Sequence, residues 1–67
     1  MMQEFLIEFS YTNNGRRKYR KESIWAENAQ EAVQEIRFRN DYYYGEPRVE
    51  KVWCSRNGKW EETEAWE

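Results

Sequence analysis

The chain has 67 residues and a formal net charge of −2, and 36% of its residues are charged while 18% are aromatic. This length allows one small domain, residues 1–67, whose core is too small to surround the enclosed cleft that most enzymes need. Four tryptophans, five tyrosines and three phenylalanines exclude a disordered chain, because they supply large apolar areas for burial.

Residues with reactive side chains are scarce. Cys54 is the single cysteine and histidine is absent, so an internal disulfide cannot form and the commonest general base and metal ligand are missing. The three glycines are each explained by a turn, which leaves no phosphate-binding loop. The N-terminus has neither a basic region nor a long apolar run. We therefore expect no enzyme, metal, cofactor or membrane span, and the unpaired cysteine fits a cytoplasmic location.

The first two predicted elements are strands that form a hairpin. Residues 5–11, "FLIEFSY", have the period of two that is typical of a strand. Asn14-Gly15 indicates a two-residue turn, because both positions of that turn need positive φ. The second strand covers residues 16–26. The side chains that share the more apolar face of the first strand are those of Phe5, Ile7, Phe9 and Tyr11.

A helix of about three turns follows the first hairpin. Asn28 can cap it, and Glu31 completes an arrangement like a capping box. We expect the helix to end before Gly45 and Pro47, with "DYYYGE" at 41–46 as a loop. Tyrosines in this loop either close one end of the core or contact a partner. The apolar stripe of the helix consists of Ala29, Ala32, Val33 and Ile36.

A second hairpin completes the predicted fold. Residues 48–56 form a strand, Asn57-Gly58 a turn, and residues 59–67 a fourth strand. The sequence thus predicts an α+β fold of order β-β-α-β-β, in which two hairpins form a four-stranded antiparallel sheet and the single helix packs on one face. Strand order is not determined by these patterns.

The two turns also predict which side chains share a face, because directly opposed residues in antiparallel strands point to the same side. Phe9 pairs with Arg20, Trp53 with Glu62, and Val49 with Trp66. The face assigned to the core carries Phe5, Ile7, Phe9, Ile24, Ala26, Val52, Cys54, Thr63 and Ala65. The opposite face, which the one helix cannot cover, carries Leu6, Tyr19, Trp25, Val49, Trp53, Trp60 and Trp66. A bulge near Glu22 and Ser23 would move Trp25 to the core side.

The uncovered aromatic face is the first candidate site. Contiguous exposed apolar area marks partner-binding surfaces, and tryptophan and tyrosine dominate interface hot spots. Two structural alternatives stay open: long charged side chains can cover the rings, or the faces can be inverted so that the tryptophans form the core. The predicted partner-binding residues are Tyr19, Trp25, Trp53, Trp60, Trp66 and Phe38. Phe38 is either an interface anchor or tucks down if the helix ends near Arg37.

The second candidate site is the basic first hairpin, "RRKYRK". We favour an edge strand protected by charge, with docking to an acidic protein surface as an alternative. Another alternative is single-stranded nucleic acid, which cations with an interleaved aromatic can hold, although the chain is net acidic. The candidate electrostatic residues are Arg16, Arg17, Lys18, Arg20, Lys21, Arg37 and Arg39.

The layout resembles that of very small phage-encoded proteins, among them anti-CRISPR proteins with a short antiparallel sheet and one helix. The likeness lies in the hairpin "FLIEFSYTNNGRRKYRKESIW", the helix "NAQEAVQEIR" and the hairpin "VWCSRNGKWEETEAW", which are architecture and carry no shared motif. The resemblance implies an inhibitor that occludes a partner surface, such as a bacterial defence complex, in the cytoplasm of a bacterial host. We also consider a homodimer through the aromatic face and, as the alternative function, a nucleic-acid-binding protein that uses residues 16–21.

Overall fold

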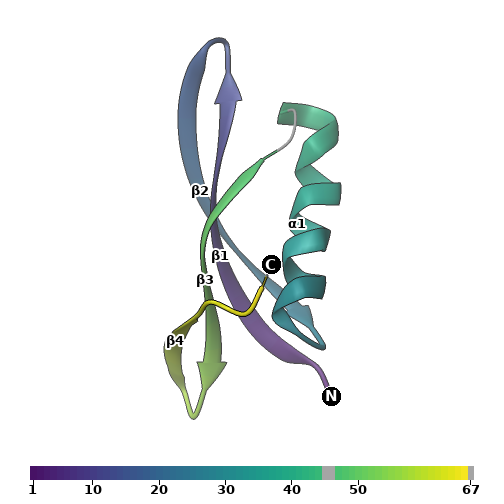
Figure 1. The fold of residues 1–67 in the computed structure, drawn as a ribbon, viewed down its shortest axis with the longest axis vertical. Helices are drawn as coiled ribbons and strands as arrows, with labels where there is room; N and C mark the ends of the chain where they lie inside the picture. The colour runs from purple at the N-terminus through teal and green to yellow at the C-terminus, as the bar shows by residue number, and fades with distance from the viewer. Residues whose placement is uncertain (45–46, 67) are drawn as a thin grey trace.

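Two hairpins and one helix follow one another in the predicted order (Figure 1). The computed structural model describes the backbone of residues 1–44 and 47–66, and the side chains of residues 1–39 and 47–66. The elements are β1 (Gln3–Asn13), β2 (Arg16–Ala26), α1 (Ala29–Tyr44), β3 (Arg48–Arg56) and β4 (Lys59–Thr63). The strands form one antiparallel sheet of order β2-β1-β3-β4, which confirms the predicted α+β class.

The molecule is elongated, with extents of 39 × 18 × 17 Å. The turn of the first hairpin and the turn of the second lie at opposite ends of the long axis, and α1 runs along one side of the sheet between them (Figure 1). The helix packs on β1, β2 and β3, so no described element covers the other face of the sheet. None of the helices in the described part of the chain is both long enough and apolar enough to cross a lipid bilayer.

The first hairpin has the predicted turn and register. Asn14 and Gly15 have φ values of 53° and 77°, as expected for the type of two-residue turn whose twist matches that of the flanking strands. Pairing then continues without a shift to the far end of both strands, and Phe9 lies opposite Arg20 as predicted. No bulge occurs within the β1–β2 ladder, so Trp25 keeps its predicted place on the uncovered face.

The helix begins at the predicted cap. The Glu31 backbone N–H donates to Asn28 Oδ1 over 2.9 Å, and the Glu27 N–H donates to Glu31 Oε2 over 3.3 Å. Two backbone donors at the helix start, which lack partners within the helix, are thus satisfied by side chains.

We expect Asn28→Ala to lower the free energy of unfolding by about 1 kcal/mol, because the substitution leaves the Glu31 N–H without its side-chain acceptor. Urea denaturation followed by circular dichroism measures this loss. Asn28→Asp keeps the acceptor and serves as the control. Equal stability of all three proteins would contradict a capping role.

The helix is longer than the sequence pattern predicts. We expected a loop from residue 41, but α1 continues to Tyr44. The first residues that disfavour a helix are Gly45 and Pro47, and nothing before them interrupts the backbone hydrogen bonds. The side chains of Tyr42, Tyr43 and Tyr44 lie outside the described residues, as does Gly45, so the expectations placed on them stay predictions.

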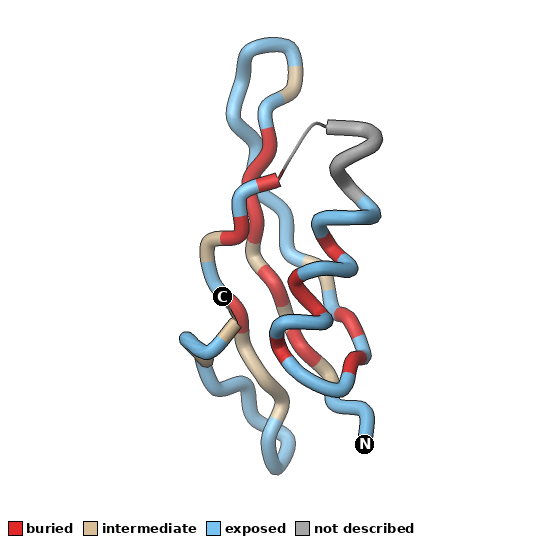
Figure 2. Tube along the Cα trace, turned by 45° about the vertical axis from the view of Figure 1, so that its right-hand side comes forward, coloured by how far each residue is buried: buried red, intermediate tan, exposed pale blue. Residues whose placement is uncertain are grey.

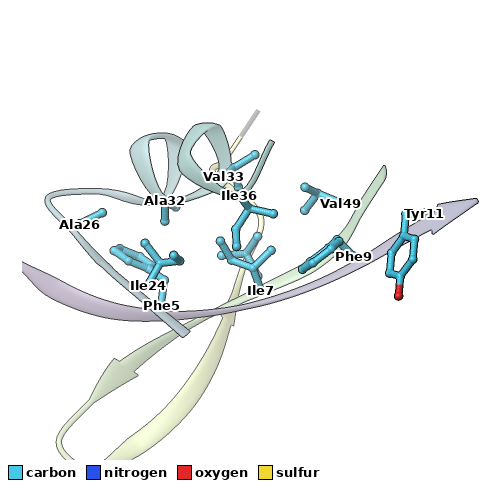
Figure 3. Packing of buried hydrophobic residues seen from close by; sticks show 12 residues of the cluster. Phe5, Ile7, Phe9, Tyr11, Ile24, Ala26, Ala32, Val33, Ile36 and Val49 are labelled. Carbon is cyan, nitrogen blue, oxygen red and sulfur yellow. The ribbon is translucent and has the colours of Figure 1, made fainter. Parts of the chain in front are cut away.

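The core lies between α1 and the facing side of the sheet (Figure 3). Ala32, Val33 and Ile36 point from the helix toward apolar side chains of the strands, which confirms the predicted stripe. The small alanines let helix and sheet approach closely, while the larger residues fill the middle. The buried hydrophobic residues are Phe5, Ile7, Phe9, Tyr11, Ile24, Ala26, Ala29, Ala32, Val33, Ile36, Val49 and Val52.

Val49 belongs to this core, whereas we predicted it on the uncovered face. The β1–β3 ladder pairs Glu8 with Lys51 but the next residue, Phe9, with Val49, so one extra residue of β3 is accommodated there. A bulge of this kind reverses the side to which the following side chains point. It brings Val49, which is 8% exposed, against the helix side of the sheet.

The fourth strand is shorter than predicted. β4 ends at Thr63, where the Thr63 hydroxyl accepts a 3.4 Å hydrogen bond from the Ala65 N–H and closes a turn. Ala65, which we placed in the core, is exposed. Trp66 does not pair with Val49; it is half-buried and packs against the core cluster. Its predicted place on the uncovered face is therefore wrong, because burial of the large indole outweighs continuation of the strand.

Candidate functional site

Four apolar side chains form a continuous band across the uncovered face of the sheet. Leu6 in β1 pairs with Trp53 in β3. Trp25 in β2 pairs with Glu4, two residues from Leu6, so Trp25 and Leu6 are diagonal neighbours. Trp60 in β4 pairs with Ser55, two residues from Trp53, which makes those two tryptophans diagonal neighbours as well. We call Leu6, Trp25, Trp53 and Trp60 the open-face cluster; it contains one residue from every strand.

The outer members of this cluster are open to solvent. Trp25 is 61% exposed and Trp60 is 44% exposed, while Trp53 and Leu6 are half-buried between them. The inverted arrangement, with the tryptophans in the core, is therefore wrong for Trp25, Trp53 and Trp60. Partly exposed indoles at both sheet edges give the face two large apolar contact points.

A charged side chain covers the middle of the open-face cluster. Lys21 Nζ lies 3.8 Å from Glu8 Oε2 and 5.4 Å from the centroid of the Trp53 ring. The lysine thereby gains a carboxylate and the negative face of an indole as neighbours. The expectation that charged side chains lie over the rings holds for Trp53. Among the described residues, no such cation lies over Trp25 or Trp60, so these two are the accessible anchors.

The basic hairpin divides its cations between the two faces of the sheet. Because β2 is regular, Arg17, Tyr19 and Lys21 share the side of Trp25. The remaining three, Arg16, Lys18 and Arg20, share the side of the buried Ile24. All six side chains are exposed, and the hairpin tip extends beyond the part of the sheet that carries the buried core (Figure 2).

Three of the five cations already have a neighbour that engages them. Arg17 donates a 2.8 Å hydrogen bond to Ser10 Oγ, Arg20 lies 3.9 Å from Glu22 Oε1, and Lys21 contacts Glu8. Arg16 and Lys18 form no ion pair with any described residue. The hairpin is therefore less uniformly available to an outside anion than its sequence indicates.

A polar network that the sequence analysis missed lies under the hairpin. Ser10 is fully buried, and its hydroxyl donates to Glu50 Oε1 over 3.0 Å while accepting from Arg17. Arg48 Nε lies 3.8 Å from the same Glu50 oxygen. Glu50 reaches Ser10 because the bulge in β3 places its side chain there. No signal in the sequence pairs residues that are 40 positions apart, so this network appears only in the folded chain.

The helical candidates lie on a different side of the molecule. Phe38 is 87% exposed on α1, and the helix continues beyond it, so of the two alternatives the one in which the ring tucks down is wrong. Arg39 is bound to Glu35 over 3.0 Å, one helical turn away, and Arg37 is exposed. Since α1 covers the core face, Arg37, Phe38 and Arg39 cannot share one flat interface with the open-face cluster.

Cys54 is half-buried against the core, as predicted for a small apolar residue. Its thiol donates to Gln3 Oε1 over 3.0 Å. Both residues line an open hollow of about 420 Å³ near the start of α1. Within the described residues no group of three or more histidine, cysteine, aspartate or glutamate side chains is placed to hold a metal ion.

The fold and the open-face cluster define the structural class of the protein, a small α+β domain with one covered and one uncovered sheet face. A scan against protein-family models, a search of curated proteins and a search of solved structures find no match to this chain. Indications of its function therefore come from its surfaces.

Proposed function

We propose that this chain is a non-enzymatic protein-interaction module that occludes a surface of a protein partner through its uncovered sheet face. The observation that carries the proposal is the open-face cluster, with Trp25 and Trp60 exposed at opposite edges of a face that none of the described helices and strands covers. Together with the small size and the β-β-α-β-β layout, it supports an inhibitor of the phage type, similar to anti-CRISPR proteins, that acts in the cytoplasm of a bacterial host.

The mechanism is steric and electrostatic. Exposed tryptophans that become fully desolvated supply most of the binding free energy in such interfaces, and their neighbours mainly exclude water. Lys21 and Glu8, which lie beside the half-buried Trp53, are placed to orient a partner, and the cations of the hairpin tip raise the encounter rate with an acidic surface. No bond needs to be made or broken for occlusion.

Nucleic-acid binding by residues 16–21 is the weaker candidate. It is favoured by Arg16 and Lys18, which lack an ion pair among the described residues, and by the exposed Tyr19 between them and Trp25. Tyr19 is, however, six residues from Trp25 along β2, about 20 Å away, so the aromatic residues do not form one stacking platform with the cations. The remaining hairpin cations already contact Ser10, Glu22 and Glu8.

The test is affinity capture from bacterial extract, followed by measurement of the dissociation constant for the captured protein. We expect Trp60→Ala to weaken binding roughly 30-fold, the effect of losing a hot-spot residue worth about 2 kcal/mol. Phe38→Ala is the matched control, because it also removes an exposed aromatic ring but on the helix side. Equal loss in both variants, or none in Trp60→Ala, would refute the open face as the binding surface.

Light scattering on the purified chain measures its mass and so shows whether the uncovered face pairs two copies. A second copy is the other occupant that the uncovered face could take, and a twofold dimer would hide both exposed tryptophans. A mass of 8.4 kDa at high concentration leaves the face available to a different protein. A stable dimer that Trp60→Ala separates would identify the face as a self-association surface and contradict the inhibitor proposal.

A further inference from the structure

β2 is a long sheet edge with nothing beside it. In the strand order β2-β1-β3-β4 its only neighbour among the described strands is β1, and it runs for 11 residues without a register shift. The opposite edge strand, β4, has only five residues and ends at the turn that Thr63 forms with Ala65. A regular edge of this length presents a row of backbone donors and acceptors to which another extended chain can pair.

The turn geometry determines which backbone groups point outward. In a two-residue turn with positive φ at Asn14 and Gly15, the flanking residues Asn13 and Arg16 exchange hydrogen bonds. The residues of β2 that form backbone hydrogen bonds to β1 then alternate along the strand, and they are the even-numbered residues. The residues whose N–H and C=O groups face away from the sheet are Arg17, Tyr19, Lys21, Ser23 and Trp25.

Most of the devices that proteins use to block an edge are missing from β2. It has no bulge, no proline and no element packed along its outer side in the described part of the chain. Its one protection is charge: five cations against the single carboxylate of Glu22. This charge repels a second β2 strand, because like charges opposite one another are destabilising, and it favours an acidic strand instead.

We propose that the β2 edge is the docking site for an extended acidic segment of a partner protein, which adds to the sheet as a fifth strand. This deepens the proposed function by giving the chemical form of the protein partner, and it rests on that function. The backbone groups of the added segment bond to the outward-facing residues of β2, while its side chains alternate between the two sheet faces.

The pattern of ion pairs predicts the alternation within the acidic segment. On the helix side, Arg16 and Lys18 have no carboxylate partner among the described residues, so acidic side chains of the segment lie there. On the open side, Arg17 and Lys21 are already engaged and Tyr19 and Trp25 are exposed, so apolar side chains of the segment lie beside the two rings. The recognised segment therefore alternates acidic and apolar residues.

The probe is a blocked nine-residue peptide of alternating glutamate and valine, compared with one of alternating lysine and valine. We expect the glutamate peptide, at low salt, to shift the backbone amide resonances of Arg17, Tyr19, Lys21 and Ser23 in the isotope-labelled protein. The lysine peptide should cause no such shifts. Failure of the glutamate peptide to bind, or shifts confined to the indole resonances, would overturn the proposal.

Ser23→Pro tests the backbone pairing itself. Its N–H faces outward, so proline removes a donor to the added strand and leaves the β1–β2 ladder intact. We expect binding of the glutamate peptide to weaken at least tenfold, whereas Ser23→Ala binds as the wild type does. Unchanged binding by a folded Ser23→Pro protein would show that side chains alone hold the peptide, and would contradict strand addition.

A charge reversal keeps the test decisive even if the proline variant does not fold. Arg16→Glu combined with Lys18→Glu should abolish binding of the glutamate peptide and create binding of the lysine peptide. Two results would assign the edge to another occupant and overturn the proposal. One is a dimer of the free chain that Ser23→Pro separates. The other is tighter binding of single-stranded oligothymidylate than of the peptide, unaffected by Ser23→Pro.

The two variants can refute docking at the β2 edge and binding by the open face separately. Trp60→Ala changes β4, at the opposite edge of the sheet, and leaves the β2 edge intact, and Ser23→Pro leaves the accessible tryptophans in place. If a captured partner binds Trp60→Ala more weakly but binds Ser23→Pro as it binds the wild type, the proposed function stands and docking at the β2 edge is refuted.

Discussion

Phe9→Ala is expected to lower the free energy of unfolding by about 3–5 kcal/mol, the usual effect of deleting a fully buried phenyl ring. Phe9 is 0% exposed, its ring centroid lies 6.3 Å from that of Tyr11, and it points into the core near Ile36 and Val49 (Figure 3). A domain of this size has a total stability of about 3–10 kcal/mol. The loss is therefore about a third of the total stability or more, and the urea midpoint of the variant should lie far below that of the wild type.

Phe38→Ala is the matched control for this loss, since the same atoms are removed from an exposed ring on α1. We expect its stability to lie within about 0.5 kcal/mol of the wild type. Urea titrations followed by circular dichroism at 25 °C compare the two. Similar midpoints for Phe9→Ala and Phe38→Ala would mean that the helix does not cover this face of the sheet.

Val49→Asn should cost about 3 kcal/mol, because the bulge in β3 places Val49 in the core, where the amide replaces apolar contacts and lacks a partner. Without the bulge, as in the register that the sequence predicts, residue 49 would lie on the uncovered face and tolerate the change. The measurement distinguishes the two registers directly.

Leu6→Asn is the control for the register experiment. Leu6 lies on the uncovered face and is half-buried beside Trp53, so an amide there stays in contact with water. We expect a cost of about 1 kcal/mol, well below that of Val49→Asn. A reversed order, with Leu6→Asn the more damaging, would place the bulge elsewhere or remove it.

The parts of the fold that local signals control are the parts that the sequence predicts well. The Asn14-Gly15 and Asn57-Gly58 turns each set a hairpin register, and once the turn is known every pair along the strands follows. The cap at Asn28 and the stripe of apolar residues on α1 are equally local. These signals were sufficient to place Trp25, Trp53 and Trp60 on one face.

The candidate site was only partly predictable, because its membership depends on contacts between distant residues. Trp66 has the spacing of an open-face residue, yet it packs against the core once β4 ends at Thr63. Arg17 reads as an exposed cation, yet it bonds to the buried Ser10. The packing of Trp66 against the core and the contact of Ser10 with Glu50, 40 positions away, both depend on residues that are distant in the sequence.

The sequence by itself determined the two hairpins, the helix cap and the uncovered aromatic face, because turns, caps and periodicity depend on residues a few positions apart. Only the tertiary structure decided the order β2-β1-β3-β4, the bulge that buries Val49 and the hydrogen bonds that join the buried Ser10 to Arg17 and Glu50. The physical reason is that β1 and β3 are some 40 residues apart. Their alignment is selected by how the whole core packs beneath α1, and pairwise preferences along the chain do not contain that information.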